Sequence, residues 1–198
     1  VRNKVSKVLD LGAGAGFQSI MAASHSDKVV ATDINERALN FGAMNAMISG
    51  CSNIEFRKGS LFEPVGGESF DLIVCNPPFV ISPKGNYQYR DSFMEGDSLC
   101  SQVVRGAPSL MNEGGFCSVL VNWHHRDESD WAERPLRWLD DSGCDVMLIC
   151  SETEDPIAYA AAWLSRDAAV SPEIFPETLD RWLAYYDRLG VGKISFGA

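Results

Sequence analysis

The sequence lacks several features that would place it in other classes of protein. Its six cysteines form no Cys-x-x-Cys pair, and they share no spacing with its three histidines that is typical of a metal site. No apolar stretch is long enough to span a bilayer, and no signal peptide is visible at the start. These absences predict a cytoplasmic protein with reduced, mostly buried thiols, without a metal and without a membrane partner.

Positive charge is also scarce. The 198 residues include 17 basic and 27 acidic side chains, which leaves a net charge of −10. Contacts with phosphate groups normally need a basic surface, so this composition argues against a nucleic-acid partner for the chain alone. A hydrophobic content of 45% is ordinary for a globular protein. The length suits one folded domain over residues 1–198 with a sizeable core.

A glycine-rich segment follows the first apolar run, which covers residues 5–11. Gly12, Gly14 and Gly16 let the backbone turn sharply and approach a ligand without hindrance from a Cβ atom. A predicted helix comes next, so its free N–H groups face the same turn. The second predicted strand ends at Asp33, and the spacing from the first glycine matches the roughly 20 residues expected of a nucleotide-binding β-α-β unit. In that arrangement the acid accepts hydrogen bonds from a ribose diol.

A second motif ends a later apolar run. Residues 70–75 predict a buried strand, and Asn76, Pro77, Pro78 and Phe79 follow it directly. The two prolines cannot donate to a sheet, so they form a stiff corner with an amide, carbonyl groups and an aromatic ring. Ligands of open α/β sheets bind at this edge. Asn-Pro and Pro-Pro are also ordinary loop sequences, and it is the upstream glycine-rich turn that favours a functional interpretation.

Together the two motifs resemble those of class I S-adenosylmethionine-dependent methyltransferases. The resemblance covers about residues 5–122 and is closest to the branch that methylates exocyclic base amines or a protein glutamine amide. It implies S-adenosylmethionine as the cofactor. It also implies a Rossmann-like, doubly wound α/β fold with helices on both faces and seven mostly parallel strands in the order 3-2-1-4-5-7-6. The alternation of predicted strands and helices agrees with such a sheet.

The apolar patterns predict thirteen elements. Strands are expected at 5–11, 28–33, 53–58, 69–76, 116–121, 145–150 and 191–196, and helices at 15–24, 35–48, 96–111, 127–141, 156–164 and 176–189. The segment 151–190 is longer than a simple connection between the last two strands, which predicts a helical insertion there. Its aromatic side chains, among them Trp182 and Tyr186, lie at helical spacing and favour packing against the sheet over a cap that faces the substrate.

The resemblance implies which residues bind the cofactor. The three glycines of the turn would pass close to its amino-acid and ribose parts, and Asp10 would position its amino group. Asp33 would hold the ribose hydroxyls, and Ile34 would contact the adenine. The acid that is usual after the third strand is replaced here by Ser60, followed by Leu61. This departure weakens the assignment of an adenine contact to that pair.

The resemblance also assigns the catalytic chemistry to the Asn-Pro-Pro-Phe motif. An exocyclic amine or amide nitrogen is a poor nucleophile because its lone pair is delocalised. The Asn76 side-chain oxygen and the Pro77 carbonyl would accept both N–H bonds, which favours a pyramidal nitrogen with its lone pair aimed at the methyl group. Pro78 would stiffen the corner, and Phe79 would stack on a planar substrate.

Two further segments carry weaker signals. The loop 80–97 directly follows the motif, so it is either a lid over the substrate or a plain solvated loop. His124 and His125 follow the fifth predicted strand and are expected in a solvated loop without a catalytic role.

The leading functional hypothesis is an amino-N methyltransferase that acts on RNA, since phenylalanine rather than tyrosine at position 79 favours nucleobases. The alternative is a protein glutamine methyltransferase of the release-factor type, which suits the negative charge better. A nicotinamide-dependent oxidoreductase would use the same β-α-β unit but leaves the Asn-Pro-Pro-Phe motif unexplained. A catalytically silent cofactor-binding module is the fourth hypothesis.

The chain begins almost directly on the first predicted strand, without an initiating methionine. We therefore expect it to be a fragment of a longer protein. Members of the resembled family often carry a separate substrate-recruiting domain ahead of the catalytic one, and such a domain would supply the missing basic surface.

Overall fold

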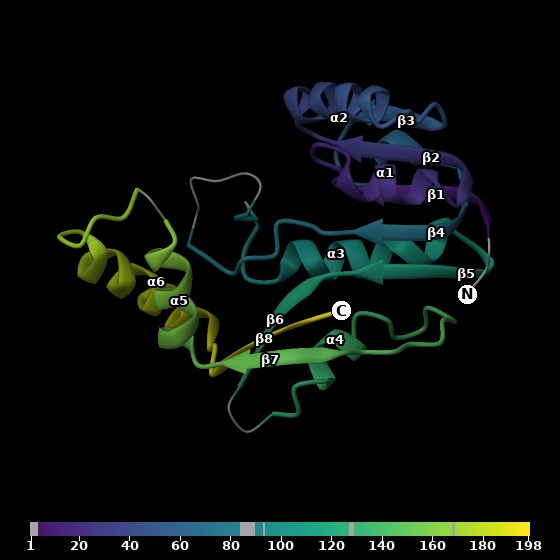
Figure 1. The fold of residues 1–198 in the computed structure, drawn as a ribbon. Coiled ribbons are helices and arrows are strands. Elements are labelled where there is room, and N and C mark those ends of the chain that lie inside the picture. Colours follow the sequence, from purple (N-terminus) through teal and green to yellow (C-terminus); the bar gives the residue numbers. More distant parts are fainter. Residues whose placement is uncertain (1–3, 84–89, 93, 127–128, 168) are drawn as a thin grey trace. The chain divides into compact units, whose positions relative to one another are not determined.

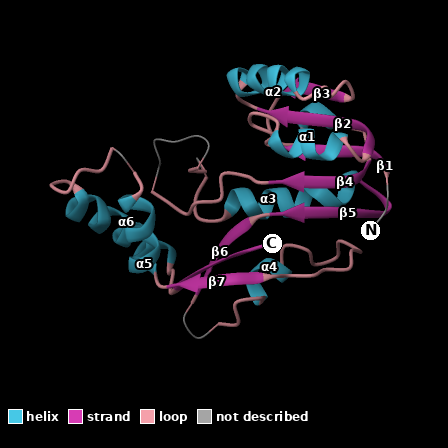
Figure 2. Ribbon diagram, in the orientation of Figure 1, coloured by secondary structure: helices cyan, strands magenta, loops and turns pink. Residues whose placement is uncertain are grey.

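The computed structural model describes residues 4–83, 90–92, 94–126, 129–167 and 169–198 (Figures 1 and 2). Contacts within the chain divide it into two compact units. Unit 1 comprises Val1–Pro77 and Val103–Val119, and unit 2 comprises Pro78–Gln102 and Leu120–Ala198.

Unit 1 is built on a five-stranded parallel sheet with the strand order β3-β2-β1-β4-β5. The strands are β1 (Val5–Leu11), β2 (Ser26–Asp33), β3 (Ile54–Lys58), β4 (Phe70–Cys75) and β5 (Met111–Val119). The order predicted for the first five strands is therefore confirmed. Strands β2 and β3 are added on one side of β1, and β4 and β5 are added on the other side. The strand order therefore switches between β1 and β4, and ligands of open α/β sheets bind at such a switch point.

Helices α1 (Phe17–Ala23) and α2 (Glu36–Ile48) contact the sheet of unit 1. Val8 of β1 and Val29 of β2 are paired across the ladder, and both form a buried cluster with Ala22 of α1. Burying these side chains removes apolar surface from water and fixes α1 against one face of the sheet.

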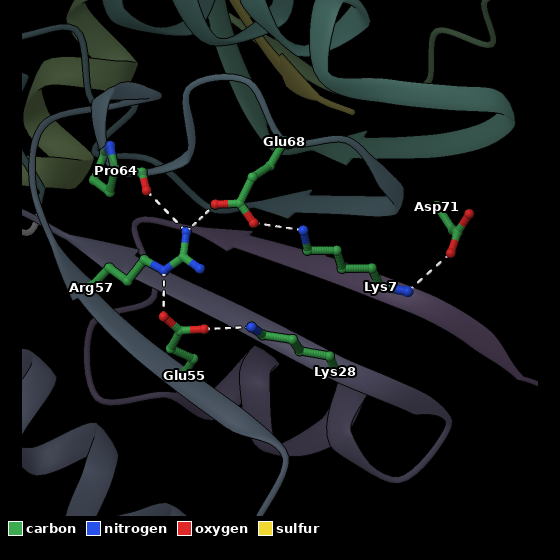
Figure 3. A network of polar contacts seen from close by, with 7 residues as sticks. All are labelled: Lys7, Lys28, Glu55, Arg57, Pro64, Glu68 and Asp71. Atoms are coloured by element: carbon green, nitrogen blue, oxygen red, sulfur yellow. Dashed lines mark hydrogen bonds and ion pairs between the residues drawn. The ribbon is translucent and has the colours of Figure 1, made fainter.

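Charged side chains form a network on the opposite face (Figure 3). Side chains alternate between the faces of a strand, so Lys7 and Lys28 point away from the face that holds α1. Lys28 Nζ lies 2.6 Å from Glu55 Oε2, and Arg57 Nε lies 2.8 Å from Glu55 Oε1. Arg57 also pairs with Glu68, whose carboxylate reaches Lys7 Nζ at 2.6 Å. The network thus connects β1, β2 and β3 to the segment that precedes β4.

Unit 2 contains a separate three-stranded antiparallel sheet with the order β6-β8-β7. Its strands are β6 (Val121–His125), β7 (Cys150–Glu154) and β8 (Lys193–Gly197), and its longer helices are α5 (Pro156–Ser165) and α6 (Phe175–Leu189). The structure therefore differs from the predicted single sheet of seven strands. Helix α3 (Ser98–Gly106) and the 3-10 turn Ala107–Leu110 replace the helix predicted at 96–111.

The sheet of unit 1 ends where the prolines begin. Strand β5 pairs with β4 as far as Val119, which lies opposite Cys75. The two prolines that follow β4 at positions 77 and 78 have no N–H group, so β5 loses its partner there. The predicted strand at 116–121 is accordingly divided at Leu120, and the chain pairs with β8 from Val121 onward.

The core of unit 2 is rich in aromatic side chains. Tyr159 of α5 packs with Trp182, Tyr185 and Tyr186 of α6 and with Ile194 of β8. These side chains lie inside the unit, as the interpretation favoured over a substrate-facing cap requires.

The helix predicted at 127–141 is wrong. Helix α4 covers only Glu133–Leu136 within the described residues of that region. Pro135 is tolerated only in the first turn of a helix, so a helix that began near 127 would have placed it in the interior. Asp141 and Gly143 then adopt positive φ values of 63° and 72°, which ends regular structure.

The strand predicted at 145–150 is also displaced, because β7 begins only at Cys150. The ladder places Cys150 opposite Gly197, and no described residue of β8 lies opposite 145–148. An apolar run without a neighbouring strand cannot form ladder hydrogen bonds.

His124 and His125 lie in β6 rather than in a solvated loop. His125 is buried, and its Nε2 lies 3.1 Å from Ser195 Oγ. Burial lowers the pKa of His124, whose backbone N–H donates to Asp97 Oδ2 at 3.3 Å. The expectation of solvent-exposed histidines is thus wrong.

The six cysteines, all within the described residues, form no disulfide with one another. Cys75 and Cys100 are buried, Cys117 is exposed, and the other three are intermediate. The prediction of mostly buried thiols therefore holds for two of the six.

Candidate cofactor and active site

The glycine-rich turn lies at the carboxyl end of β1 and folds over the end of β2. The N–H groups of Gly12 and Ala13 both donate to the Thr32 carbonyl at 2.9 Å. Gly12 and Gly14 adopt φ values of 73° and 54°, in the left-handed region that favours glycine. Among the described residues other than its chain neighbours, none has a heavy atom within 4 Å of the position that a Cβ would occupy at either glycine. The turn therefore borders open space that a ligand can fill.

Gly16 is constrained by packing instead. It has a φ of 83°, and an added Cβ would lie 3.3 Å from the Gly42 Cα and 3.5 Å from the Phe56 ring. The glycine thus lets α2 pass close to the start of α1. Its proximity to the cofactor stays a prediction.

Asp33, the last residue of β2, lies beside the glycine-rich turn. Its Oδ2 accepts the Gly14 N–H at 2.9 Å, and its Oδ1 accepts the Asn35 N–H at 2.7 Å. A carboxylate oxygen has room for a second donor, so Asp33 remains able to accept hydrogen bonds from a diol. Ile34 beside it is 46% exposed. The backbone bonds orient this acid before any ligand arrives.

Asp10 is buried beneath the turn with one oxygen unpaired. Ser19 Oγ donates to its Oδ2 at 2.5 Å, while Oδ1 has no hydrogen-bond partner within the part of the chain that the structure describes. Burial raises the pKa of this carboxyl to about 6. An unpaired buried acceptor is costly, and a cationic amino group would satisfy it. Asp10, Asp33 and the open glycines therefore fit the polar groups of S-adenosylmethionine.

Ser60 and Leu61 follow β3. Leu61 adopts a φ of 46°, which is uncommon for a residue with a side chain. The Ser60 N–H donates to Glu63 Oε2 at 3.3 Å. An acidic side chain that the sequence reasoning missed therefore lies beside Ser60. The Ser-x-x-Glu pattern, typical of a capping box, would have indicated it.

The Asn-Pro-Pro-Phe motif begins beside the glycine-rich turn. Leu11 at the end of β1 pairs with Cys75 at the end of β4, so Gly12 and Asn76 leave the sheet from neighbouring positions. Asn76 is exposed and Pro77 is buried. The parallel pairing of β1 and β4 thus brings the glycine-rich turn and the start of the second motif, Asn76, to one edge of the sheet of unit 1.

The last two residues of the motif belong to unit 2. The Phe79 ring lies 5.4 Å from the Phe196 ring with a tilt of 45°, and it packs against the aromatic core of that unit. Part of the Phe79 ring is thus covered by other side chains of unit 2. Its stacking on a substrate, like the stiffening role of Pro78, stays a prediction.

The described ends of the loop 80–97 are held by hydrogen bonds. The Val80 N–H donates to the Arg90 carbonyl at 3.1 Å, and the buried Asp91 accepts from Ser82 Oγ at 3.1 Å. The predicted lid itself rests mainly on 84–89 and 93, which lie outside the described residues.

No group of three or more His, Cys, Asp or Glu side chains that could hold a metal ion occurs within the described ranges. None of the helices in those ranges is long and apolar enough to cross a membrane.

Residues 1–130 match the methyltransferase small domain family. The chain belongs to this family. Members of this family are S-adenosylmethionine-dependent methyltransferases.

Curated relatives act on two kinds of substrate. The ribosomal protein uL3 glutamine methyltransferase of Bradyrhizobium diazoefficiens is 31% identical over 76% of this chain and 52% of its own length. The release factor glutamine methyltransferase of Xylella fastidiosa is 33% identical over 59% of this chain and 47% of its own. The ribosomal RNA small subunit methyltransferase C of Alcanivorax borkumensis is 28% identical over 80% and 42%. The chain thus spans about half the length of the curated relatives it matches.

Solved structures show the same fold. The YcgJ protein of Bacillus subtilis has a TM-score of 0.54 at 14% identity and covers 99% of this chain and 89% of its own. A methyltransferase from Pyrococcus furiosus has a TM-score of 0.53 at 20% identity and covers 76% and 70%. Both agree with a Rossmann-like methyltransferase fold.

Proposed function

We propose that this chain is the catalytic part of an S-adenosylmethionine-dependent N-methyltransferase that acts on a planar nitrogen. The pairing of β1 with β4 supports this proposal most directly, because it sets the glycine-rich turn and Asn76 side by side. In this proposal residues 1–198 act as one catalytic domain, and a further domain of the longer protein recruits the substrate. The half-length match to the curated relatives supports such a domain.

The chain's own acids would hold the cofactor. Asp10, ionised once a cationic amino group approaches, would bind that group through its unpaired Oδ1. Asp33 would accept the ribose hydroxyls, with Ile34 and the Ser60–Leu61 pair near the adenine. S-adenosylmethionine supplies an activated methyl group when it is bound.

Asn76 and Pro77 would orient the substrate nitrogen. Their oxygens would accept its two N–H bonds, so the lone pair would point away from both and towards the methyl carbon. In that position the nitrogen would take the methyl group, the sulfonium would leave as a neutral thioether, and the nitrogen would give up one proton to solvent. Orientation and electrostatics, rather than a strong base, would provide the rate enhancement.

The distribution of charge favours a protein substrate. Unit 2 contains 18 acidic and 9 basic residues, a net charge of −9, whereas unit 1 contains 9 and 8, a net charge of −1. The chain that leaves the motif enters the acidic unit, which would repel phosphate groups and attract a basic polypeptide. We therefore favour a glutamine amide in a basic protein, which reverses the order of the two hypotheses drawn from the sequence.

An exocyclic amine of a nucleobase in RNA is the second candidate. Phe79 at the end of the motif supports it, because a phenyl ring offers a face for a base. The match to the ribosomal RNA methyltransferase, which extends over 80% of the chain, supports it as well.

Transfer of tritium from labelled S-adenosylmethionine into a cell extract would test both candidates. The extract is separated into RNA and protein after the reaction, and the longest available protein is used. We expect label in protein, at a glutamine side chain. Label in RNA would reverse the preference, and binding of a nicotinamide dinucleotide instead of S-adenosylmethionine would refute methyl transfer.

A further inference from the structure

Two tyrosine hydroxyl groups hold the backbone just beyond the Asn-Pro-Pro-Phe motif. The Ile81 N–H donates to Tyr159 Oη at 3.2 Å, and Tyr186 Oη donates to the Ile81 carbonyl at 2.8 Å. All three residues are at most 2% exposed. Tyr159 comes from α5 and Tyr186 from α6. Both helices of the predicted insertion therefore hydrogen-bond to Ile81, two positions after Phe79.

Further contacts stiffen this arrangement. Asn122 Nδ2 donates to Tyr159 Oη at 2.5 Å, and the Tyr159 and Tyr186 rings lie 6.5 Å apart in an edge-on geometry. The neighbouring Tyr185 accepts the Gly96 N–H at 2.7 Å. Adjacent tyrosines of α6 therefore hold both ends of the segment between the motif and α3.

The hydroxyl groups of Tyr159 and Tyr186 have a role in hydrogen bonding beyond the packing of the rings. Phenylalanine would supply nearly the same apolar area, and a buried hydroxyl is unfavourable unless it is hydrogen-bonded. Burial raises the pKa of both Tyr159 and Tyr186, so both hydroxyls stay protonated and neutral at ordinary pH. A neutral hydroxyl can donate to a carbonyl and accept from an N–H, which are the two roles used at Ile81.

We propose that Tyr159 and Tyr186 are positioning residues for methyl transfer. They hold Ile81 and thereby set the path of the backbone through Pro78 and Phe79. This inference rests on the proposed function. It gives α5 and α6 a part in the reaction although neither tyrosine is assigned a contact with cofactor or substrate.

The variants Tyr159→Phe and Tyr186→Phe test this role, because each removes one hydroxyl and keeps the ring. Thr178→Val is the matched control. Thr178 is a buried residue of α6 whose hydroxyl donates to the Ile174 carbonyl at 2.8 Å rather than to Ile81. Each full-length variant is assayed for its rate of tritium transfer at saturating S-adenosylmethionine, into the fraction that the wild type labels. Cofactor affinity and the thermal midpoint are measured in parallel.

We expect kcat to fall about 10- to 100-fold in both tyrosine variants, since small misplacements of reacting groups have effects of this size. Affinity for S-adenosylmethionine should stay unchanged, and Thr178→Val should retain the wild-type kcat. A wild-type kcat in the tyrosine variants would overturn the proposal. So would an equal loss in Thr178→Val at a similar thermal midpoint, because that result indicates general loosening.

Hydrogen exchange of the Ile81 amide provides a readout that needs no activity. Exchange should accelerate in Tyr159→Phe and stay slow in Thr178→Val, whereas slow exchange in both would overturn the contact on which the proposal depends. A wild-type protein that labels neither RNA nor protein would defeat the proposed function itself. A fully active wild type with fully active tyrosine variants would defeat the positioning role alone.

Discussion

Unit 1 and unit 2 use different kinds of interaction to hold their candidate functional residues. In unit 1, parallel strands bring short turns together at one edge, and backbone N–H groups orient Asp33. In unit 2, buried tyrosine hydroxyls from two helices reach the backbone at Ile81. Unit 1 is also close to neutral, whereas unit 2 carries a net charge of −9.

This difference indicates that the two units have separate roles in binding the cofactor and the substrate. Backbone geometry at the end of a parallel sheet serves a cofactor that every member of a family shares. Side-chain packing and surface charge can vary without disturbing that sheet, and they suit the selection of a substrate. We therefore propose that unit 1 binds the cofactor and that unit 2 selects the substrate.

The largest expected effect is at Asn76, the residue directly after β4, where a substitution should separate methyl transfer from cofactor binding. Asn76→Ala should lower methyl transfer by about 10²- to 10³-fold, because it removes an oxygen proposed to orient the nitrogen. Affinity for S-adenosylmethionine, measured by equilibrium dialysis, should hardly change. Asn112→Ala provides the control, since Asn112 donates to Asp71 Oδ1 near the opposite ends of the strands. Equal losses of affinity and transfer in Asn76→Ala would break the proposed division.

A moderate effect concerns the pH dependence of cofactor binding in unit 1. The carboxyl of Asp10 has a pKa raised to about 6, and a cationic amino group binds its ionised form. Affinity for S-adenosylmethionine should therefore rise about tenfold between about pH 5 and about pH 7. Asp10→Asn should flatten this dependence, whereas Asp27→Asn at an exposed site should keep it. A dependence that persists in Asp10→Asn would assign the titration to another group.

The same shift has a consequence for stability without cofactor. A raised carboxyl pKa means that the folded protein favours the protonated form of Asp10. Its contribution is present below the ordinary value of 3.8 and is lost as the pH rises through about 6.

The smallest expected effect lies in the charged network of unit 1. Hydrogen bonds from Arg57, and next from Lys28, lower the pKa of Glu55 to about 2. The contribution of Glu55 is thus present above its ordinary value of 4.5 and is lost as the pH falls towards about 2. The Glu55 side chain is 44% exposed, so Glu55→Gln should lower the free energy of unfolding by less than about 1 kcal/mol at neutral pH.

Urea unfolding at several pH values would measure this difference. It should shrink below pH 4.5 and in high salt, because solvent and ions screen exposed pairs. Glu113→Gln, at an exposed site in β5, serves as the control. A difference that is independent of pH would exclude the ion pairs as its cause.

Much of unit 1 could be predicted from local patterns. Strands β1 to β4 begin and end within two residues of their predicted bounds, because each is a short run of apolar, or alternating apolar and polar, residues closed by turn residues. The neighbouring placement of Gly12 and Asn76 follows from the order of β1 and β4, which the resemblance had implied. The contacts to the cofactor stay predictions.

Unit 2 was predicted less well, and particular residues explain why. Pro135 lies inside the helix predicted at 127–141, where its missing N–H group and its ring interrupt a helix. The apolar run at 145–150 has the composition of a strand but meets only the end of β8. His124 and His125 became part of β6 because pairing with β8 begins after Leu120, which no local pattern shows.

The sequence by itself determined the turns, the apolar strands and the chemistry of the two motifs, because glycine conformation, missing proline N–H groups and side-chain periodicity are local properties. Only the tertiary structure decided which buried groups meet. Ile81 finds its partners 78 and 105 residues further along the chain, in α5 and α6. Contacts at that separation depend on how whole elements pack, and no short pattern of residues encodes them.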